Sequence, residues 1–141
     1  KFEHQSGIRA TLNMHEHGIP LQPDVQIQVL HIVQEALSNV RKHASASKVE
    51  LEVHKDVQWR FMVRDDGVGF DARQGHGPSH VGMKIMRERA GGIGAHVEII
   101  SRPGQGTIAS LTLPTHPVSR SSGTAITGLE LASLAGLMRS H

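Results

Sequence analysis

The sequence predicts an α/β (α+β) two-layer sandwich with a largely antiparallel sheet. At 141 residues and 38% hydrophobic content, the chain is long enough for one domain with a sizeable core. A helix-like apolar period covers residues 25–40, and strand-like alternation recurs at 49–63 and 97–113. The order of these signals predicts a sheet packed against helices.

The first elements are a strand and a long helix. Residues 8–14 alternate loosely between apolar and polar types, which predicts a strand. Pro23 then precedes the apolar-periodic segment, and Asp24 suits its N-cap or first turn. The helix is expected to run to about His43, and the small residues 44–47 close it.

The remaining elements follow the same two periodicities. Alternating apolar residues predict an antiparallel hairpin over residues 49–63. A glycine-rich loop covers residues 67–82, and a short helix is expected over 81–90. Two further strands flank the turn at 102–106, namely residues 97–99 and 107–113.

The core pattern ends at Pro114, so we divide the chain into a domain at 1–114 and a tail at 115–141. Residues 115–128 are rich in Ser, Gly, Thr and Pro, as linkers are. Thr127 and Glu130 have the spacing of a capping box that opens a short amphipathic helix. We expect this helix to lie outside the core, and the sequence suggests no role for it.

Composition narrows the function classes. The net charge is only +2, and three Phe, one Trp and no Tyr leave few platforms for stacking bases, so direct nucleic-acid binding is not favoured. Cysteine is absent, which excludes disulfides and thiolate metal sites. No segment approaches the roughly 18 apolar residues of a membrane span, so we expect a soluble domain. A first residue of Lys1 suggests a piece of a longer protein.

One wall of the long helix carries a polar row. Glu35, Asn39 and Lys42 are spaced i, i+4 and i+7, so their side chains share a face. Carboxylate and amide oxygens suit a hydrated Mg²⁺, and the ammonium group suits a phosphate. Alternatively, the row is an ordinary solvated helix face.

A second polar stretch, Asp65-Asp66-Gly67-Val68-Gly69, follows a predicted strand. One carboxylate there can accept the exocyclic amine of adenine, and glycines let the backbone close on the ring. In this interpretation Thr107 lies beside Asp65. The alternative is a simple Asp-Gly turn. A dinucleotide-type G-x-G-x-x-A pattern also starts at Gly67, but two preceding Asp residues would repel a pyrophosphate.

The second predicted helix follows the glycine loop. If Gly82 opens it, free backbone N–H groups at that end can take up phosphate oxygens, with His80 close by. The alternative is a flexible loop that ends in an ordinary helix. The pairs His15/His17 and His76/His80 lack a third ligand at a diagnostic spacing, so a transition-metal site is not favoured.

Four stretches in this order resemble the ATPase superfamily shared by DNA gyrase B, the heat-shock chaperone of that type, mismatch-repair ATPases and sensor histidine kinases. Residues 34–44 (QEALSNVRKHA) resemble the N-box of the kinase subfamily that includes the nitrate/nitrite sensors. Residues 65–69 match its first glycine box, and residues 82–90 (GMKIMRERA) resemble the second. Residues 101–107 (SRPGQGT) and the closing LTLP match its last strands, so that the similarity spans about 7–114.

The resemblance implies a Bergerat-type fold with a mixed five-stranded sheet and helices on one face. It implies ATP and Mg²⁺ as cofactors, with Asn39 on the metal and Glu35 holding it directly or through water. Lys42 would meet the phosphates, Asp65 would bind adenine, and the Gly75–Gly82 loop would form a lid. The residues expected at the nucleotide are Asn39, Lys42, His43, Asp65, Gly67, Gly69, His80, Gly82, Met83, Gly106 and Thr107.

The predicted function is that of the ATP-binding catalytic domain of a two-component sensor histidine kinase. The chain has no His-Asp dipeptide, the site of phosphorylation in this subfamily, so the γ-phosphoryl group would go to a histidine on a separate dimerisation domain. A helix-turn-helix response regulator would be the next partner. The parent protein is expected to be a membrane-anchored homodimer, with this part cytoplasmic, monomeric and inactive alone.

Two alternatives remain at this point. In the first, the chain is an ATPase in which Glu35 activates water as a general base. In the second, it is a nucleotide-binding interaction module without catalysis.

Overall fold

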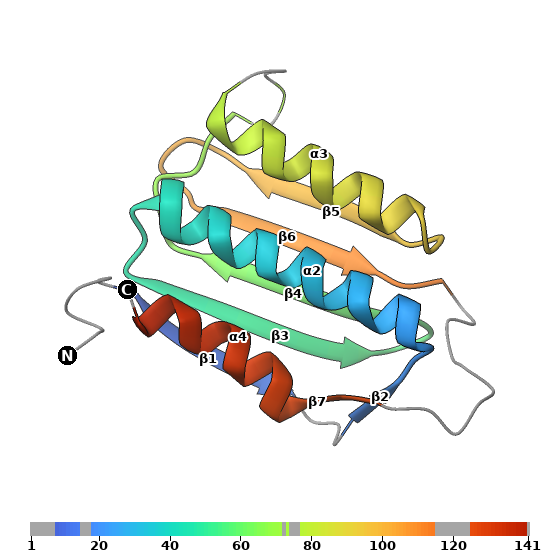
Figure 1. The fold of residues 1–141 in the computed structure, drawn as a ribbon. Coiled ribbons are helices and arrows are strands. Elements are labelled where there is room, and N and C mark those ends of the chain that lie inside the picture. Colours follow the sequence, from blue (N-terminus) through green and yellow to red (C-terminus); the bar gives the residue numbers. More distant parts are fainter. Residues whose placement is uncertain (1–7, 15–17, 72, 74–76, 115–124, 141) are drawn as a thin grey trace.

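The computed structural model describes residues 8–14, 18–71, 73, 77–114 and 125–140 (Figure 1). Its main sheet has five strands in the order β1-β3-β4-β6-β5. β1 runs parallel to β3, and all other neighbours are antiparallel, which confirms the predicted mixed sheet. The strands are β1 (Arg9–Met14), β3 (Lys48–Lys55), β4 (Trp59–Asp65), β5 (His96–Ser101) and β6 (Thr107–Thr112).

Three helices cover one face of this sheet, as Figure 1 shows, and the predicted two-layer arrangement is confirmed. They are α2 (Pro23–Asn39), which continues as the π-helix η1 (Val40–Ala44), α3 (Pro78–Gly91) and α4 (Gly128–Ser140). The helix α2 connects β1 to its parallel neighbour β3, a connection that antiparallel strands do not need. Among the described residues, no helix combines the length and apolarity that crossing a bilayer requires.

The core lies between the sheet and the helices. Because side chains alternate along a strand, Leu51, Phe61 and Leu111 point inward from three neighbouring strands and are buried. Val29 and Val33 of α2 pack onto them, and each such side chain contributes roughly 1.5–3 kcal/mol through burial.

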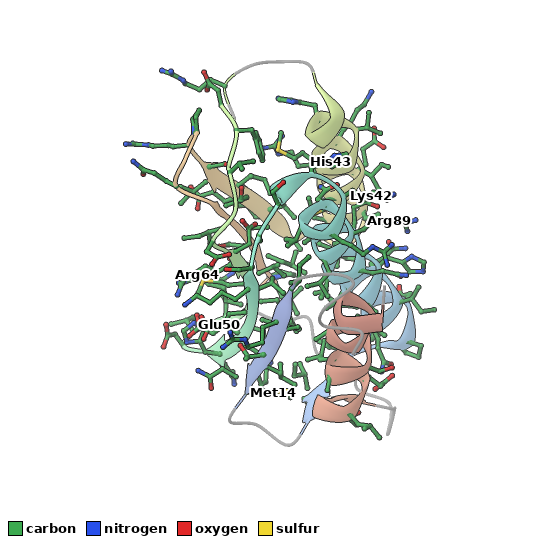
Figure 2. The ribbon with its side chains drawn as sticks, turned by 90° about the vertical axis from the view of Figure 1, so that its left-hand side faces the viewer. Met14, Lys42, His43, Glu50, Arg64 and Arg89 are labelled. Carbon is green, nitrogen blue, oxygen red and sulfur yellow. The ribbon has the colours of Figure 1, made fainter. Side chains whose placement is uncertain are left out.

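In the described part of the chain, the opposite face of the sheet carries no helix. In Figure 2, Glu50 and Arg64 project from this side, whereas Lys42 and Arg89 lie on the helical side. The Nη1 atom of Arg64 lies 3.6 Å from Oε1 of Glu50. An exposed ion pair of this kind contributes little to the free energy of unfolding. This face therefore adds little to the core.

Both main helices begin with proline in the first turn. Proline lacks a backbone N–H, but the N–H groups of the first turn have no partner within the helix, so no helical hydrogen bond is lost. In α2, Gln22 is the N-cap and Asp24 lies in the first turn. The second helix starts at Pro78, three residues before its predicted start, because the apolar period begins only with Val81. Gly82 therefore lies inside the helix and does not open it, contrary to the sequence-based expectation.

The C-terminal helix α4 belongs to the core, which corrects the expectation that it lies outside. The predicted capping box is confirmed, because the Thr127 amide donates to Glu130 and the Glu130 amide to the Thr127 hydroxyl, both at 3.1 Å. Leu131 and Ala135 are buried in the common core. Strand β7 (Ala125–Thr127) also pairs with β2 (Gly18–Pro20), a strand that the sequence did not predict. Of the predicted linker 115–128, residues 125–127 form β7 and Gly128 begins α4, which corrects that part of the prediction. Residues 115–124 lie outside the described part, and the division at 114 stays a prediction.

Candidate functional site

A cavity lies between the end of α2, η1, α3 and the inner side of the sheet. Its volume is about 340 Å³. Strands β4, β5 and β6 form its floor, and the helices form its walls. It is lined by Ala36, Asn39, Val40, Lys42, His43, Val63, Asp65, Gly69, Phe70, Met83, Met86, Ile99, Thr107 and Ala109.

Asp65 is the only acid that lines the cavity among the described residues. It ends β4 and is only 7% exposed. Burial raises the pKa of its carboxyl group, while hydrogen bonds from the amides of Gly67 (2.8 Å) and Thr107 oppose the rise. The ionised group is thus held by backbone donors but remains poorly solvated. A ligand that brings an additional N–H donor would stabilise its charge.

The neighbouring Asp66 points elsewhere. Its carboxylate accepts hydrogen bonds from the Ser47 hydroxyl at 2.6 Å and from the amides of Ser47 and Lys48 at 2.9 and 3.0 Å. These bonds, the Ser47 hydroxyl first, lower the pKa of Asp66. Asp66 therefore ties the loop to the start of β3, and Asp65 alone faces the cavity.

A row of polar side chains crosses the sheet beside Asp65. Asp65 faces Thr107 in the register of β4 and β6, and Thr107 faces Ser101 in that of β6 and β5. The Ser101 hydroxyl lies 2.7 Å from that of Thr107 and accepts a hydrogen bond from the Phe70 amide at 2.9 Å. The row fixes the loop after β4 against the edge strand β5.

Two glycines allow the loops at this end to approach closely. Gly69 has φ +64°, and a Cβ atom there would collide with the Arg102 carbonyl oxygen. Gly106 has φ +75°, and a Cβ atom there would collide with the Asp65 carbonyl oxygen. Both positions therefore need glycine for backbone conformation and for space.

At the other end of the cavity, two oxygen-bearing side chains converge. The point where a Cβ atom of Gly82 would lie is 2.6 and 2.8 Å from Nδ2 and Oδ1 of the Asn39 amide and 2.7 Å from Oε2 of Glu35. Gly82 thus leaves room for both side chains against α3. A carboxylate and an amide oxygen that share one small space suit Mg²⁺, which takes one or two protein oxygens and keeps several waters.

Lys42 and His43 line the same end from the π-helix η1. Both are exposed, and Figure 2 shows them at the end of the helical layer. The π-helical turn ends at Ser45, which has a left-handed φ of 50°. Single π-turns often occur at functional sites, because the wider turn changes the direction of the side chains that follow.

His80 lies in the first turn of α3. Its Nε2 atom is buried and has no hydrogen-bond partner among the described residues. Its ring meets the Phe70 ring edge-on, with centroids 6.2 Å apart. His15, His17 and His76 lie outside the described residues. Within the described part, no three His, Asp or Glu side chains are grouped as metal ligands would be.

The cavity brings together most of the predicted nucleotide residues. Seven of them line it, namely Asn39, Lys42, His43, Asp65, Gly69, Met83 and Thr107. The other four lie next to lining residues, namely Gly67, His80, Gly82 and Gly106, and the predicted metal residue Glu35 lies beside Gly82. The predicted lid is described only from Gly77 onward.

Sequence reasoning did not predict half of the lining residues, namely Ala36, Val40, Val63, Phe70, Met86, Ile99 and Ala109. It also did not predict Ser101, which supports Thr107. Phe70 could have been predicted from the sequence, because it is an aromatic residue directly after the glycine box. The others read as ordinary core or strand positions, and their role depends on strand register.

Curated relatives include sensor proteins of bacteria. The chain is 43% identical over 94 residues to "Sensor histidine kinase LiaS" of Bacillus subtilis, a match that covers 66% of this chain and 26% of that protein. It is 30% identical over 114 residues to "Nitrate/nitrite sensor protein NarQ" of Escherichia coli, covering 79% and 20%. The chain thus spans about a quarter or less of these relatives. The match to NarQ confirms the predicted resemblance to the subfamily with nitrate/nitrite sensors.

Solved structures share the fold. The histidine kinase domain of a blue-light activated histidine kinase from Erythrobacter litoralis superposes with a TM-score of 0.64 at 24% identity, over 81% of this chain and 56% of that one. The histidine kinase AdeS of Acinetobacter baumannii superposes with a TM-score of 0.65 at 11% identity, over 82% and 58%. The family described as "Histidine kinase-, DNA gyrase B-, and HSP90-like ATPase" matches residues 24–117. The chain therefore belongs to this family of ATP-binding domains.

Proposed function

We propose that the chain is the catalytic ATP-binding domain of a two-component sensor histidine kinase. The observation that carries the proposal is the polarity of the cavity, with a buried carboxylate at one end and Asn39, Lys42 and His43 at the other. A nucleotide has the matching polarity, with a hydrogen-bonding base at one end and anionic phosphates at the other. Relatives named as histidine kinases support the kinase assignment.

At the base end, Asp65 accepts the exocyclic amine of adenine in this proposal. Its raised pKa supports the role, because a buried carboxylate gains most from an added N–H donor. Gly67 and Gly69 let the backbone lie against the purine, and Thr107 stands next to the carboxylate. Phe70 and Ile99 provide the apolar surface for the ring.

At the phosphate end, Glu35 and Asn39 hold Mg²⁺, Lys42 meets the phosphates and His43 flanks them. The metal ion, when bound, neutralises phosphate charge and fixes the orientation of the γ-phosphoryl group. His80, Gly82 and Met83 close this end from α3. Nε2 of His80, which has no hydrogen-bond partner among the described residues, is one group that a ligand can satisfy. Gly82 contributes space here in place of the free amide that the sequence suggested.

The reaction proposed for the parent protein is transfer of the γ-phosphoryl group to a histidine nitrogen. The nitrogen attacks the γ-phosphorus, the bond from that phosphorus to the bridging oxygen breaks, and ADP leaves. This chain supplies positioning and charge neutralisation. The accepting histidine belongs to a dimerisation domain, so the chain alone should bind nucleotide and turn over little.

The wider setting is part of the same proposal. The partners are the dimerisation domain of the same kinase and a helix-turn-helix response regulator. The parent protein is a membrane-anchored homodimer, and this domain lies in the cytoplasm as a monomer that makes no direct contact with nucleic acid. The curated relatives that are named sensors support the part of this setting in which the parent protein is a sensor.

Calorimetric titration of Mg·ATP and Mg·ADP tests the nucleotide site. The wild type is expected to bind both, and Asp65→Asn to lose about a hundredfold in affinity, because the amide replaces a charged acceptor of the base. Asp66→Asn is the matched control, since it removes the same charge from the adjacent residue outside the cavity. Equal losses in the two variants, or no binding by the wild type, would refute the proposal.

Hydrolysis separates the kinase from the ATPase alternative. The chain alone should hydrolyse ATP slowly. Glu35→Gln should weaken Mg·ATP binding but should leave this slow rate of hydrolysis unchanged when the variant is saturated with nucleotide. Steady hydrolysis that Glu35→Gln abolishes would instead assign Glu35 as the general base of an ATPase.

A further inference from the structure

We propose that Ser101 is a positioning residue that makes the Thr107 hydroxyl a hydrogen-bond acceptor toward the bound base, so that the site selects an amino group over a carbonyl. The inference rests on the proposed function, because it concerns the same nucleotide. It adds a residue at the edge of the sheet to the groups that decide which base is bound.

The geometry places Ser101 directly behind the base-reading pair. Ser101, Thr107 and Asp65 occupy one cross-strand row over β5, β6 and β4. Ser101 is buried, at 8% exposure, and does not line the cavity. Thr107 lies between Ser101 and Asp65 and does line it. Ser101 therefore acts on a ligand only through neighbours that line the cavity, the Thr107 hydroxyl and the Phe70 backbone, and of these only the Thr107 hydroxyl is a side-chain hydrogen-bonding group.

Counting protons assigns the direction of each hydrogen bond. The Ser101 hydroxyl has one proton and two lone pairs. It donates to the Gly106 carbonyl oxygen at 3.1 Å and accepts from the Phe70 amide at 2.9 Å. Its third contact is the Thr107 hydroxyl at 2.7 Å. By distance alone either hydroxyl could donate in this contact. Because the Gly106 carbonyl oxygen can only accept, we assign the Ser101 proton to it, and in this assignment Thr107 donates its own proton to Ser101.

This assignment leaves only lone pairs on the cavity side of Thr107. The Asp65 carboxylate beside it is also an acceptor when ionised. Two adjacent acceptors suit the amino group of adenine, which has two N–H donors. They disfavour the carbonyl oxygen of hypoxanthine at the same position of the ring, because acceptors would then face one another.

The test compares ATP with inosine triphosphate (ITP), which carries that carbonyl oxygen. Calorimetry gives the ratio of the two dissociation constants for the wild type, Ser101→Ala and Ser101→Thr. In Ser101→Ala, the Thr107 proton is free to turn toward the ligand, so the preference for ATP should fall about tenfold, the factor that one neutral hydrogen bond supplies. Ser101→Thr keeps a hydroxyl group and should retain the preference.

Ser110→Ala is the matched control. It removes a hydroxyl from β6, on the opposite face of the sheet from the cavity, and should leave the ratio unchanged. If Ser101→Ala weakens both nucleotides equally, Ser101 has a structural role only and the inference fails. If the wild type binds ATP but Ser101→Ala weakens both nucleotides equally, the proposed function still stands. If the wild type binds no nucleotide, the proposed function and the inference about Ser101 are both wrong.

A second variant decides the question if Ser101→Ala does not fold. Thr107→Val removes the hydroxyl but keeps the backbone amide that bonds to Asp65. An accepting Thr107 predicts weaker ATP binding and unchanged ITP binding in this variant. If ITP binding weakens more than ATP binding, Thr107 donates its proton to the base and the inference is wrong.

Discussion

The two ends of the cavity are built from different parts of the molecule. At the base end, Asp65, Thr107 and Ser101 lie on three neighbouring strands and are joined by hydrogen bonds to one another or to backbone. At the phosphate end, Glu35, Asn39 and Lys42 extend from one helix and its π-helical continuation. Of these three, none has a salt bridge to the described residues.

The difference indicates how each end recognises its part of a ligand. Strand side chains held by backbone donors keep one geometry, so the base end is preorganised. Long side chains on a helix end keep rotamer freedom until an ion or phosphate orders them. The base end should therefore determine which nucleotide is bound, and the phosphate end should determine how tightly its charge is held.

The largest expected effect comes from Gly69→Ala at the base end. A Cβ atom there meets the Arg102 backbone, which cannot turn aside as a side chain can. The left-handed φ costs about 1–2 kcal/mol and the overlap about 1–3 kcal/mol, so unfolding should become easier by about 2–5 kcal/mol. Urea denaturation measures the loss.

Gly104→Ala is the control for this prediction. Gly104 has a similar φ of +81°, but a Cβ atom there meets nothing within 4 Å. It should show only the conformational cost of about 1–2 kcal/mol. If both variants lose the same free energy of unfolding, the backbone at the base end moves to accommodate the added Cβ atom and is not rigid.

A smaller and different effect is expected from Gly82→Ala at the phosphate end. The added Cβ meets only side-chain atoms of Glu35 and Asn39, which can move. Stability should change by no more than about 1 kcal/mol, because alanine also favours the helix. Mg·ATP binding should weaken about tenfold while adenosine binding stays the same, since the displaced groups face the phosphates.

Gly91→Ala at the other end of α3 is the matched variant, with nothing within 4 Å of its Cβ position. It should leave the binding of both ligands unchanged. A loss of adenosine affinity in Gly82→Ala would show that the two ends are not independent.

The smallest effect is the pH dependence of stability, which separates Asp65 from Asp66. Burial raises the pKa of Asp65 in the folded state above its ordinary value of 3.8, because the ionised carboxylate is poorly solvated there. The folded state is therefore destabilised as the pH rises from 3.8 through the folded pKa. Hydrogen bonds lower the pKa of Asp66, so its contribution is present above pH 3.8 and is lost as pH falls through its folded pKa.

The free energies of unfolding of the wild type, Asp65→Asn and Asp66→Asn, measured between about pH 3 and 8, test these two opposite pH dependences. Asp65→Asn should gain stability relative to the wild type at neutral pH and lose that advantage in acid. Asp66→Asn should behave in the opposite way. Parallel curves for the two variants would contradict the assignment of only Asp65 to a buried site.

Much of the site followed from local pattern. Helical spacing alone placed Glu35, Asn39 and Lys42 on one wall, because an α-helix repeats its side-chain directions every three to four residues. The strand before Asp65 and the glycines after it marked a loop that closes on a ligand. The family resemblance then supplied the sheet order and the identity of the ligand, which periodicity does not contain.

Other features depend on contacts between segments far apart in the chain. Of two adjacent aspartates, Asp65 faces the cavity because β4 pairs with β6, while Asp66 reaches back to Ser47. The same sheet register makes Ser101 part of the site. Gly82 matters for the space it leaves beside Asn39, which follows from the packing of α3 on α2.

The sequence by itself determined the five strands of the main sheet, the two main helices, the polar row on the helix and the carboxylate at the strand end, because each depends on neighbouring residues. Tertiary structure alone decided that Asp66 bonds to Ser47, that α4 joins the core through Leu131, and that Ser101 stands behind Thr107. These outcomes depend on strand register and helix packing, which bring distant segments together and are not encoded in any one local pattern.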